Sequence, residues 1–243
     1  MIDWVEIPAG VLVQGTPIDD IGTLAAAHAD IGVERSWIAK EAPRHEVTLS
    51  AFAIARTPVT VEQWSRFADD VGLPPPRQPH GPNHPIDGIP WTAANQFCVW
   101  LADKYRLRAR LPTESEWERA ARGGDAREYP WGDRYEPGRA NLADLRLRKT
   151  TPVGSFSKGE SPFGILDLAG NVDEWTATLY EPYPGAPPDA PSVADANSVA
   201  TDPHVTRGGG FVHNRDLARC ARRHGLFAPA RGAGFRLVLE SAG

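Results

Sequence analysis

Cysteine is scarce in this chain: only Cys98 and Cys220 occur among its 243 residues. Two cysteines cannot form the disulfide network that stabilises small secreted domains. Cys98 lies in the apolar helical pattern "ANQFCVWLADKY", and Cys220 lies in "ARCARR". Free cysteine is among the most buried residue types, so we expect both to be buried structural thiols.

Long apolar runs and excess positive charge are also missing. No stretch approaches the roughly 18 apolar residues that a membrane span needs. The segment "MIDWVEIPAG" starts acidic and resembles neither a signal peptide nor an anchor. The net charge is −5, and the short run "RLRAR" at 106–110 is typical of a solvated helix end. We therefore predict a cytoplasmic protein without a membrane or nucleic-acid partner.

Glycine, proline and tryptophan are abundant, with 23, 23 and 8 residues. Glycine and proline at this level, without periodicity, indicate many turns. Each tryptophan buries a large ring and needs a partner for its N–H group, so we expect aromatic anchors between long loops. Without internal repeats, the length fits a single domain over 1–243.

Three segments predict strands. "WVEIPAGVLVQGT" (4–16) alternates and breaks at Pro8, which predicts a hairpin, and 44–57 predicts one further strand. "GFRLVLE" (234–240) predicts a closing strand.

Three helices are indicated by periodicity and by capping residues. Thr60 with Gln63, and Thr113 with Glu116, each fit a capping box. A third helix is expected over about 92–105, and a short one within 21–32. Short strands, a few helices and a loop-rich second half predict an α+β fold.

Several ordered motifs resemble those of the sulfatase-modifying-factor family, which contains the formylglycine-generating enzymes. The motifs are "TPVTVEQW", "HPIDGIPWTAANQFCVWLADKYRLRARLPTESEWERAARGG", "YPWGD", "PVGSF", "FGILDLAGNVDEWT", "RGGGF" and "GFRLV". The resemblance covers about 5–239. It implies the complex variant of the C-type-lectin fold, with little regular structure. It also implies one of several activities: copper-dependent formylglycine formation, substrate binding in iron-dependent sulfoxide synthases, or ligand display, and fold alone does not choose among these.

The copper-binding cysteine pair of these enzymes has no counterpart here. In the segment "RGGGFVHNRDLARCARR", His213 stands at the first family cysteine and Gly210 at a family serine, and the second cysteine is absent. Two thiolates suit Cu(I), whereas a single imidazole does not replace them. The resemblance therefore implies an atypical member that does not generate formylglycine.

Histidines near the same segment leave a different metal site open. His213, His224, His204 and Asp216 are close in sequence, and two histidines with a carboxylate suit Fe(II). We name His213 as the candidate catalytic residue, either as a ligand of iron or copper or as a general base. The alternative is a histidine that only satisfies a loop hydrogen bond.

Calcium is a further implication of the resemblance. Carried over to this chain, one family site consists of Asp167, Gly170, Val172 and Glu174, and a second begins at Asn141 and Leu142. Calcium prefers carboxylate and carbonyl oxygens. The alternative is a loop held by carboxylate–amide hydrogen bonds.

The cleft is expected to contain further polar residues. Asp173 replaces a family tryptophan and is expected to be wet or paired with arginine. The remaining candidates are Asn214, Asp216, Arg219, Arg222 and Arg223. Arginine clusters bind carboxylates in bidentate fashion but also form ordinary ion pairs. Two functions stay open: a metal-dependent oxidoreductase acting on a small molecule or peptide, or a binding module that uses the lectin-like cleft.

Overall fold

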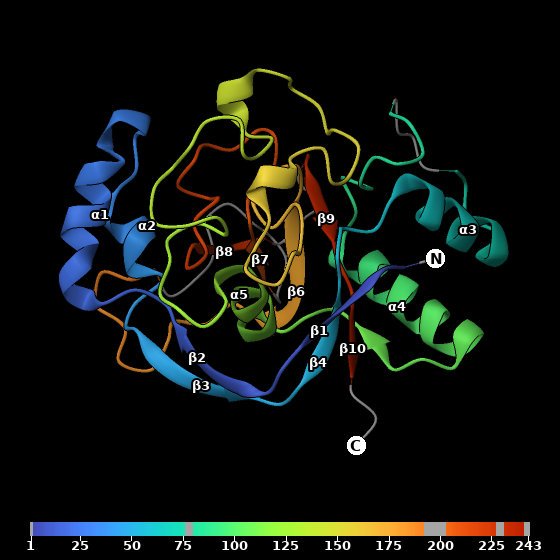
Figure 1. Cartoon of the computed structure of the whole chain (residues 1–243), viewed down its shortest axis with the longest axis horizontal. Helices are drawn as coiled ribbons and strands as arrows, with labels where there is room; N and C mark the ends of the chain where they lie inside the picture. Colours follow the sequence, from blue (N-terminus) through green and yellow to red (C-terminus); the bar gives the residue numbers. More distant parts are fainter. Residues whose placement is uncertain (1, 76–79, 192–202, 227–230, 241–243) are drawn as a thin grey trace.

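The computed structural model describes residues 2–75, 80–191, 203–226 and 231–240. Five α-helices and ten strands lie in these ranges, joined by long loops (Figure 1). The helices are α1 (Ile21–Ala27), α2 (Arg35–Ala39), α3 (Val61–Val71), α4 (Trp91–Tyr105) and α5 (Glu114–Arg122). The strands are β1 (Trp4–Ile7), β2 (Gly10–Gln14), β3 (His45–Leu49), β4 (Phe52–Ala55), β5 (Ala109–Arg110), β6 (Asp173–Leu179), β7 (His204–Arg207), β8 (Arg223–Leu226), β9 (Ala233–Phe235) and β10 (Val238–Glu240).

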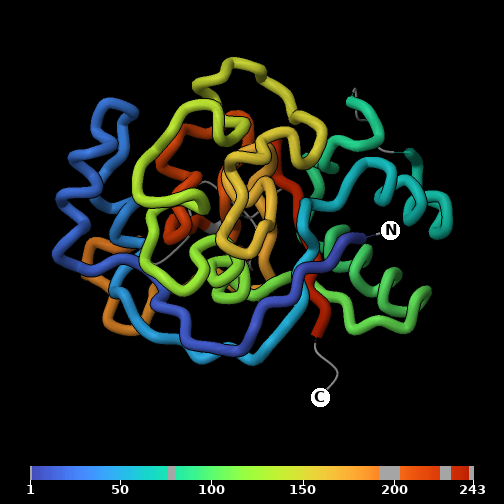
Figure 2. The backbone as a smooth tube through the Cα atoms, in the orientation of Figure 1, coloured from blue at the N-terminus to red at the C-terminus, as the bar shows by residue number. Residues whose placement is uncertain are grey.

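The strands form three small sheets. One sheet has the order β1-β4-β10-β5 and is antiparallel, and β2 pairs with β3 in a two-stranded ribbon. The third has the order β8-β7-β6-β9, in which only β6 and β9 run parallel. The first and last strands flank β4, so the two ends of the chain meet in one sheet (Figure 2). The mixed content agrees with the expected α+β fold.

All three strand predictions differ from the structure in detail. The break at Pro8 is present, but β1 and β2 do not pair with each other as a hairpin. Instead, β1 pairs with β4 and β2 pairs with β3, both in antiparallel fashion, with Ile7 opposite Phe52 and Gly10 opposite Leu49. The expected single strand over 44–57 is therefore two strands, because the partner ladder is interrupted at the same point. The predicted closing strand is likewise divided into β9 and β10.

The helix predictions are confirmed. The side-chain oxygens of Thr60 and Thr113 each accept a hydrogen bond from the backbone N–H group three residues on. The side chains of Gln63 and Glu116 in turn accept from the backbone N–H groups of Thr60 and Thr113. Such reciprocal bonds satisfy N–H groups that a helix start leaves without partners. The helix expected over 92–105 is α4, and the short one is α1. Local sequence therefore determined where α3 and α5 begin.

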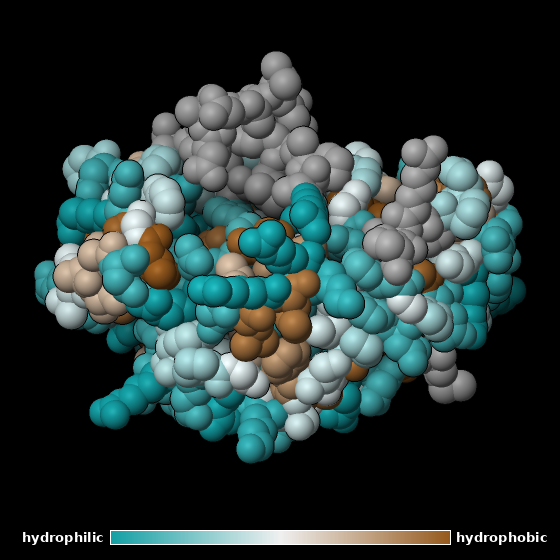
Figure 3. All heavy atoms as spheres, turned by 90° about the horizontal axis from the view of Figure 1, so that it is seen from above, coloured by the Kyte–Doolittle hydropathy of each residue, from teal (hydrophilic) through white to brown (hydrophobic). Residues whose placement is uncertain are grey.

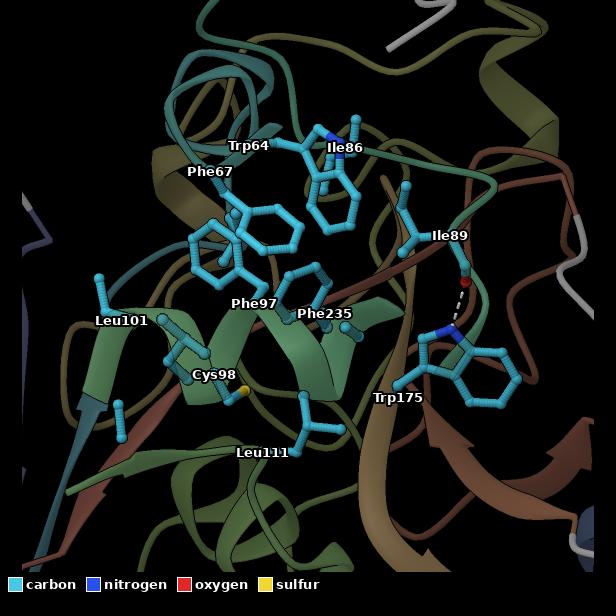
Figure 4. Close-up of a cluster of buried hydrophobic side chains, with 14 of the residues drawn as sticks. Trp64, Phe67, Ile86, Ile89, Phe97, Cys98, Leu101, Leu111, Trp175 and Phe235 are labelled. Carbon is cyan, nitrogen blue, oxygen red and sulfur yellow. Dashed lines mark hydrogen bonds between the residues drawn. The ribbon is translucent and has the colours of Figure 1, made fainter. Parts of the chain in front are cut away.

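An aromatic cluster packs α3 and α4 against the sheets (Figure 4). The Trp64 and Phe97 rings are stacked with centroids 5.9 Å apart, and Phe235 meets Phe97 edge-to-face at 5.4 Å. Trp175 of β6 belongs to the same cluster, and its Nε1–H donates to the carbonyl of Ile89 at 2.7 Å. Trp64 and Trp175 thus serve as buried anchors between elements distant in sequence.

Candidate functional site

The segment after β7 is a glycine loop, here defined as 207–213. Gly208 and Gly209 have φ angles of +90° and +65°, which side chains rarely adopt. A Cβ atom at Gly209 would lie 2.8 Å from the Cβ of Leu217. The loop is bonded to the "AGNV" segment, since Gly170 N–H donates to the Gly208 carbonyl and Phe211 N–H to the Asn171 carbonyl. The glycines therefore allow the loop to lie against the start of β6.

Asp173, His213 and His224 come together beneath this loop, and we call them the histidine cluster. His224 Nε2 lies 2.5 Å from Asp173 Oδ2, and both side chains are buried. The ring centroids of His213 and His224 are 5.9 Å apart in an edge-on arrangement. Burial opposes ionisation of Asp173, but the charge and hydrogen bond of His224 lower the pKa of its carboxyl below the ordinary value. Asp173 is therefore paired with a histidine and is neither wet nor bound to arginine.

The hydrogen bond of His213 fixes its protonation pattern. Its Nδ1 accepts the N–H group of Gly210 at 2.9 Å, which places the ring proton of the neutral form on Nε2. Burial lowers the pKa of His213 despite the opposing charge of Asp173, so the ring is neutral near pH 7. A base or metal ligand acting through Nε2 would need the other tautomer, in which two N–H groups face each other. The contact therefore favours a hydrogen-bond donor.

The other histidine and polar residues expected at this site have partners of their own or face solvent. The ring of His204 stacks on Trp91 with centroids 3.8 Å apart. Asp216 is buried against Arg222, whose Nε lies 3.2 Å from Oδ2, and Asn214 is exposed. Within the described ranges, no group of three or more His, Cys, Asp or Glu side chains could hold a metal ion. The two imidazoles and the carboxylate of the cluster are therefore not arranged to hold one ion.

The arginine cluster differs from its expected place in the cleft. Arg219, Arg222 and Arg223 are exposed by 0%, 4% and 1%, so they cannot bind a ligand from solvent. Arg219 pairs in bidentate fashion with Glu41, and Arg223 Nη2 lies 2.9 Å from Glu114. A buried guanidinium must be paired, and acids distant in sequence supply the partners here. The arginines thus form ion pairs within the interior.

The thiols do not form a copper site. Cys98 and Cys220 are both buried, in two different hydrophobic clusters, and burial raises the pKa of each to about 12. Cu(I) is bound by thiolates that converge on one point. Neither thiol meets this requirement, so the cysteines of this chain do not fit a copper ion.

We predict that the protein does not convert the cysteine of a Cys-x-Pro-x-Arg peptide to formylglycine. The reason is that no thiolate pair exists to bind Cu(I). The measurement is mass spectrometry of the peptide after incubation with protein, Cu(I) and oxygen. An aldehyde product above the protein-free control would contradict the prediction.

The residues expected to bind calcium meet the requirement only in part. Asp167 is buried, and burial raises the pKa of its carboxyl to about 6, an environment that a bound cation would relieve. Asn141 Oδ1 is buried and has no hydrogen-bond partner within the described structure. Glu174, however, accepts two bonds from Arg236 at 2.6 and 2.7 Å and one from Trp117 at 2.8 Å. An arginine already neutralises the carboxylate that was expected to bind Ca²⁺.

Calcium binding stays a prediction with a direct measurement. If Asp167, Gly170, Val172 and Glu174, or the site at Asn141 and Leu142, bind Ca²⁺, millimolar calcium should raise the melting temperature above its value in EGTA. Saturation at a hundred times the Kd corresponds to about 2.7 kcal/mol of stabilisation. Asp167→Asn should abolish a shift that arises at the first site, and Asn141→Ala one that arises at the second. Identical melting curves in calcium and EGTA would exclude both sites.

A pocket beside the glycine loop was not predicted from the sequence. Its described lining consists of Ala143, Arg146, Arg148, Phe211, Val212 and Arg231, and its volume is about 490 Å³. The sequence feature that could have indicated it is the basic run "RLRK" at 146–149. The net charge of the whole chain is negative, so the total does not reveal this local positive charge. The backbone joins the two sides, because Ala143 N–H donates to the His213 carbonyl at 3.0 Å. The pocket and the histidine cluster therefore share one loop.

The face seen from above Figure 1 is mostly hydrophilic where it is described, with hydrophobic residues in scattered patches (Figure 3). Among the described helices, none has the length and apolar character needed to cross a bilayer.

Comparisons with known proteins agree with the geometry. The model of the sulfatase-modifying factor enzyme 1-like domain matches residues 3–241. Hercynine oxygenase of Mycolicibacterium thermoresistibile is 31% identical over 239 residues, covering 80% of this chain and 52% of that protein. The formylglycine-generating enzyme of Mycobacterium tuberculosis is 31% identical over 242 residues, covering 69% of this chain and 78% of that enzyme. The chain thus spans about half the length of hercynine oxygenase.

Among solved structures, PvdO from Pseudomonas aeruginosa superposes with a TM-score of 0.75 at 28% identity, covering 98% of this chain and 94% of PvdO. Treponema denticola variable protein 1 reaches a TM-score of 0.74 at 22% identity, which shows a shared fold. Both likenesses extend over nearly the whole chain, so they include the sheets that carry the glycine loop.

Proposed function

Because the chain belongs to the family of the sulfatase-modifying factor enzyme 1-like domain, we propose that its cleft binds a small-molecule or peptide substrate and that His213 donates a hydrogen bond to it. The observation that carries the proposal is the Gly210–His213 contact of 2.9 Å, which leaves Nε2–H available. Among the contacts of the described residues, this N–H group has no acceptor. The site therefore has a neutral donor next to a pocket.

A neutral imidazole donor stabilises negative charge that develops on a substrate oxygen. The Asp173–His224 pair supports this role by position, because the His224 ring, bonded to the buried Asp173 carboxylate, lies edge-on to the His213 ring with centroids 5.9 Å apart and helps to orient the donor. Removal of one such donor from an enzyme typically costs about 10²–10³ in kcat. A sequence relative named for the oxygenation of hercynine supports a small-molecule substrate.

A binding function without chemistry is the second candidate. It is favoured by the absence of a thiol pair and of a three-donor metal group among the residues that the structure describes. The sequence led us to expect a metal-dependent oxidoreductase. At this site its metal ion would need further ligand atoms from the substrate. Elemental analysis of the purified protein separates these functions: stoichiometric iron or copper, lost in His213→Asn, favours the oxidoreductase, and its absence favours acid–base chemistry or binding.

We predict that His213 is neutral and protonated on Nε2 at pH 7. Burial and the Gly210 N–H group both oppose a proton on Nδ1. Long-range ¹H–¹⁵N spectra of the imidazole rings measure the tautomer directly, and His213→Asn assigns the resonance. His80→Asn is the matched control, because its ring stacks on His84 away from the cluster. A charged ring or an Nδ1-protonated ring at pH 7 would refute the donor role.

The same variants test the function. With hercynine as the first substrate tested, His213→Asn should lower kcat by about 10²-fold or more. Its melting temperature should stay close to that of the parent. If the parent binds the probe without converting it, and the variant binds equally well, His213 has no chemical role and the binding function holds.

A further inference from the structure

The pocket beside the glycine loop concentrates positive charge on a chain whose net charge is negative. Arg146, Arg148 and Arg231 line it, all three are exposed, and the described lining contains no acidic residue. Among the ion pairs of the described residues, none involves these three guanidinium groups. In contrast, the buried Arg219, Arg222 and Arg223 each lie within 4 Å of a carboxylate. The three pocket arginines are thus available to bind an external anion.

The backbone holds two of these arginines in an unusual conformation. Arg146 and Arg148 have φ angles of 55° and 53°, in the left-handed region that residues with a Cβ atom rarely adopt. Arg146 ends the turn η3 (Ala143–Leu145), the yellow-green turn at the top of Figure 1. Residues kept in this region occur preferentially at ligand sites, because the surrounding structure must impose the conformation. Both guanidinium groups belong to a single three-residue segment that lines the pocket.

The third arginine is fixed from the opposite side. The guanidinium of Arg231 lies over the Phe211 ring, 5.3 Å from its centroid, and its Nη2 donates to the Arg148 carbonyl at 2.8 Å. A guanidinium has five N–H donors, so these contacts leave donors for a ligand. Fixing the side chain in advance lowers the entropy that binding would otherwise lose.

The rest of the lining is apolar. Val212 is 41% exposed although it is a large hydrophobic residue, and Phe211 and Ala143 adjoin it in the pocket. The volume of about 490 Å³ lies in the range of small-molecule sites, roughly 300–1,000 Å³. A ligand with two or more negative groups and a short carbon skeleton would match the three arginines and the apolar wall together.

We propose that this pocket binds a small polyanion, a molecule that carries two or more carboxylate or phosphate groups. Arginine binds both groups in bidentate fashion, so the shared chemistry is an oxyanion recognised by paired N–H donors. The inference goes beyond the proposed function, because it concerns a pocket whose lining does not include the His213 side chain. It holds whether His213 does chemistry or not.

The test is calorimetric titration of the full chain with citrate, with pyrophosphate and with neutral glycerol. Citrate and pyrophosphate separate the carboxylate source from the phosphate source. We expect one of the two to bind with an affinity that falls as salt is raised, and glycerol not to bind. Arg148→Gln and Arg231→Gln should each weaken binding about tenfold or more, since bonds to charged groups are the strong ones.

Arg106→Gln is the matched control, since Arg106 is also exposed, also has a positive φ of 54°, and does not line the pocket. It and His213→Asn should bind as the parent does. If neither anion binds, or if Arg106→Gln weakens binding as much as Arg148→Gln does, the proposal is wrong. Loss of turnover in His213→Asn with unchanged anion binding would leave both proposals standing. Unchanged anion binding in both Arg148→Gln and Arg231→Gln would overturn this one alone.

Discussion

Trp117→Ala should lower the free energy of unfolding by about 3–5 kcal/mol, the usual cost of truncating a fully buried large ring. Trp117 is 0% exposed in α5 and packs in a hydrophobic cluster with Ile7, Phe52 and Leu168. Its Nε1–H also donates to Glu174, so the substitution removes a donor from a buried carboxylate. Urea unfolding followed by circular dichroism measures the change.

The effect should extend to the glycine loop. A Cβ atom at Gly208 would lie 3.0 Å from Cζ2 of Trp117, so the indole lies directly against that part of the loop. Trp117→Phe keeps most of the packing and removes only the N–H donor, and we expect it to lose less than the alanine variant does. Trp37→Ala is the control, because Trp37 is 38% exposed and its truncation should change stability by about 0.5 kcal/mol or less. A loss below about 1 kcal/mol for Trp117→Ala would show that the ring does not support the fold.

Arg219→Met should be comparably destabilising, by about 3–5 kcal/mol, because it leaves a buried carboxylate without its partner. Glu41 is 0% exposed, and its two oxygens accept from Arg219 Nη1 and Nη2 at 2.9 and 2.7 Å. Arg222 Nε lies farther away, at 3.7 Å, and does not replace these bonds. Thermal and urea unfolding of the variant measure the loss.

The double variant Arg219→Met/Glu41→Leu separates the pair from its burial cost. Removing both charges should recover much of the stability, since a buried ion pair contributes little net free energy compared with apolar residues of similar size. Arg215→Met is the control, because its partner Asp30 is mostly exposed and such pairs contribute about 0–1 kcal/mol. If Arg219→Met is as stable as the parent and instead loses anion binding, Arg219 is a ligand residue after all.

Local sequence determined the helix starts and the family. Each capping box, at Thr60 and at Thr113, consists of two residues three positions apart, so the local sequence contains both partners. The family motifs likewise identified the glycine loop, and His213 is the loop histidine that contacts the Asp173–His224 pair by its ring. The missing thiol pair followed from residue types alone.

Tertiary structure decided the partners of the charged residues. Asp173 binds a histidine 51 positions away, and Arg219 binds Glu41 across 178 positions, distances over which no local pattern predicts a contact. An arginine is a buried ion-pair partner or is available to a ligand depending on where the fold places the acidic residues. For that reason the expected cleft arginines at 219, 222 and 223 are interior, whereas Arg146, Arg148 and Arg231 line a pocket and are exposed.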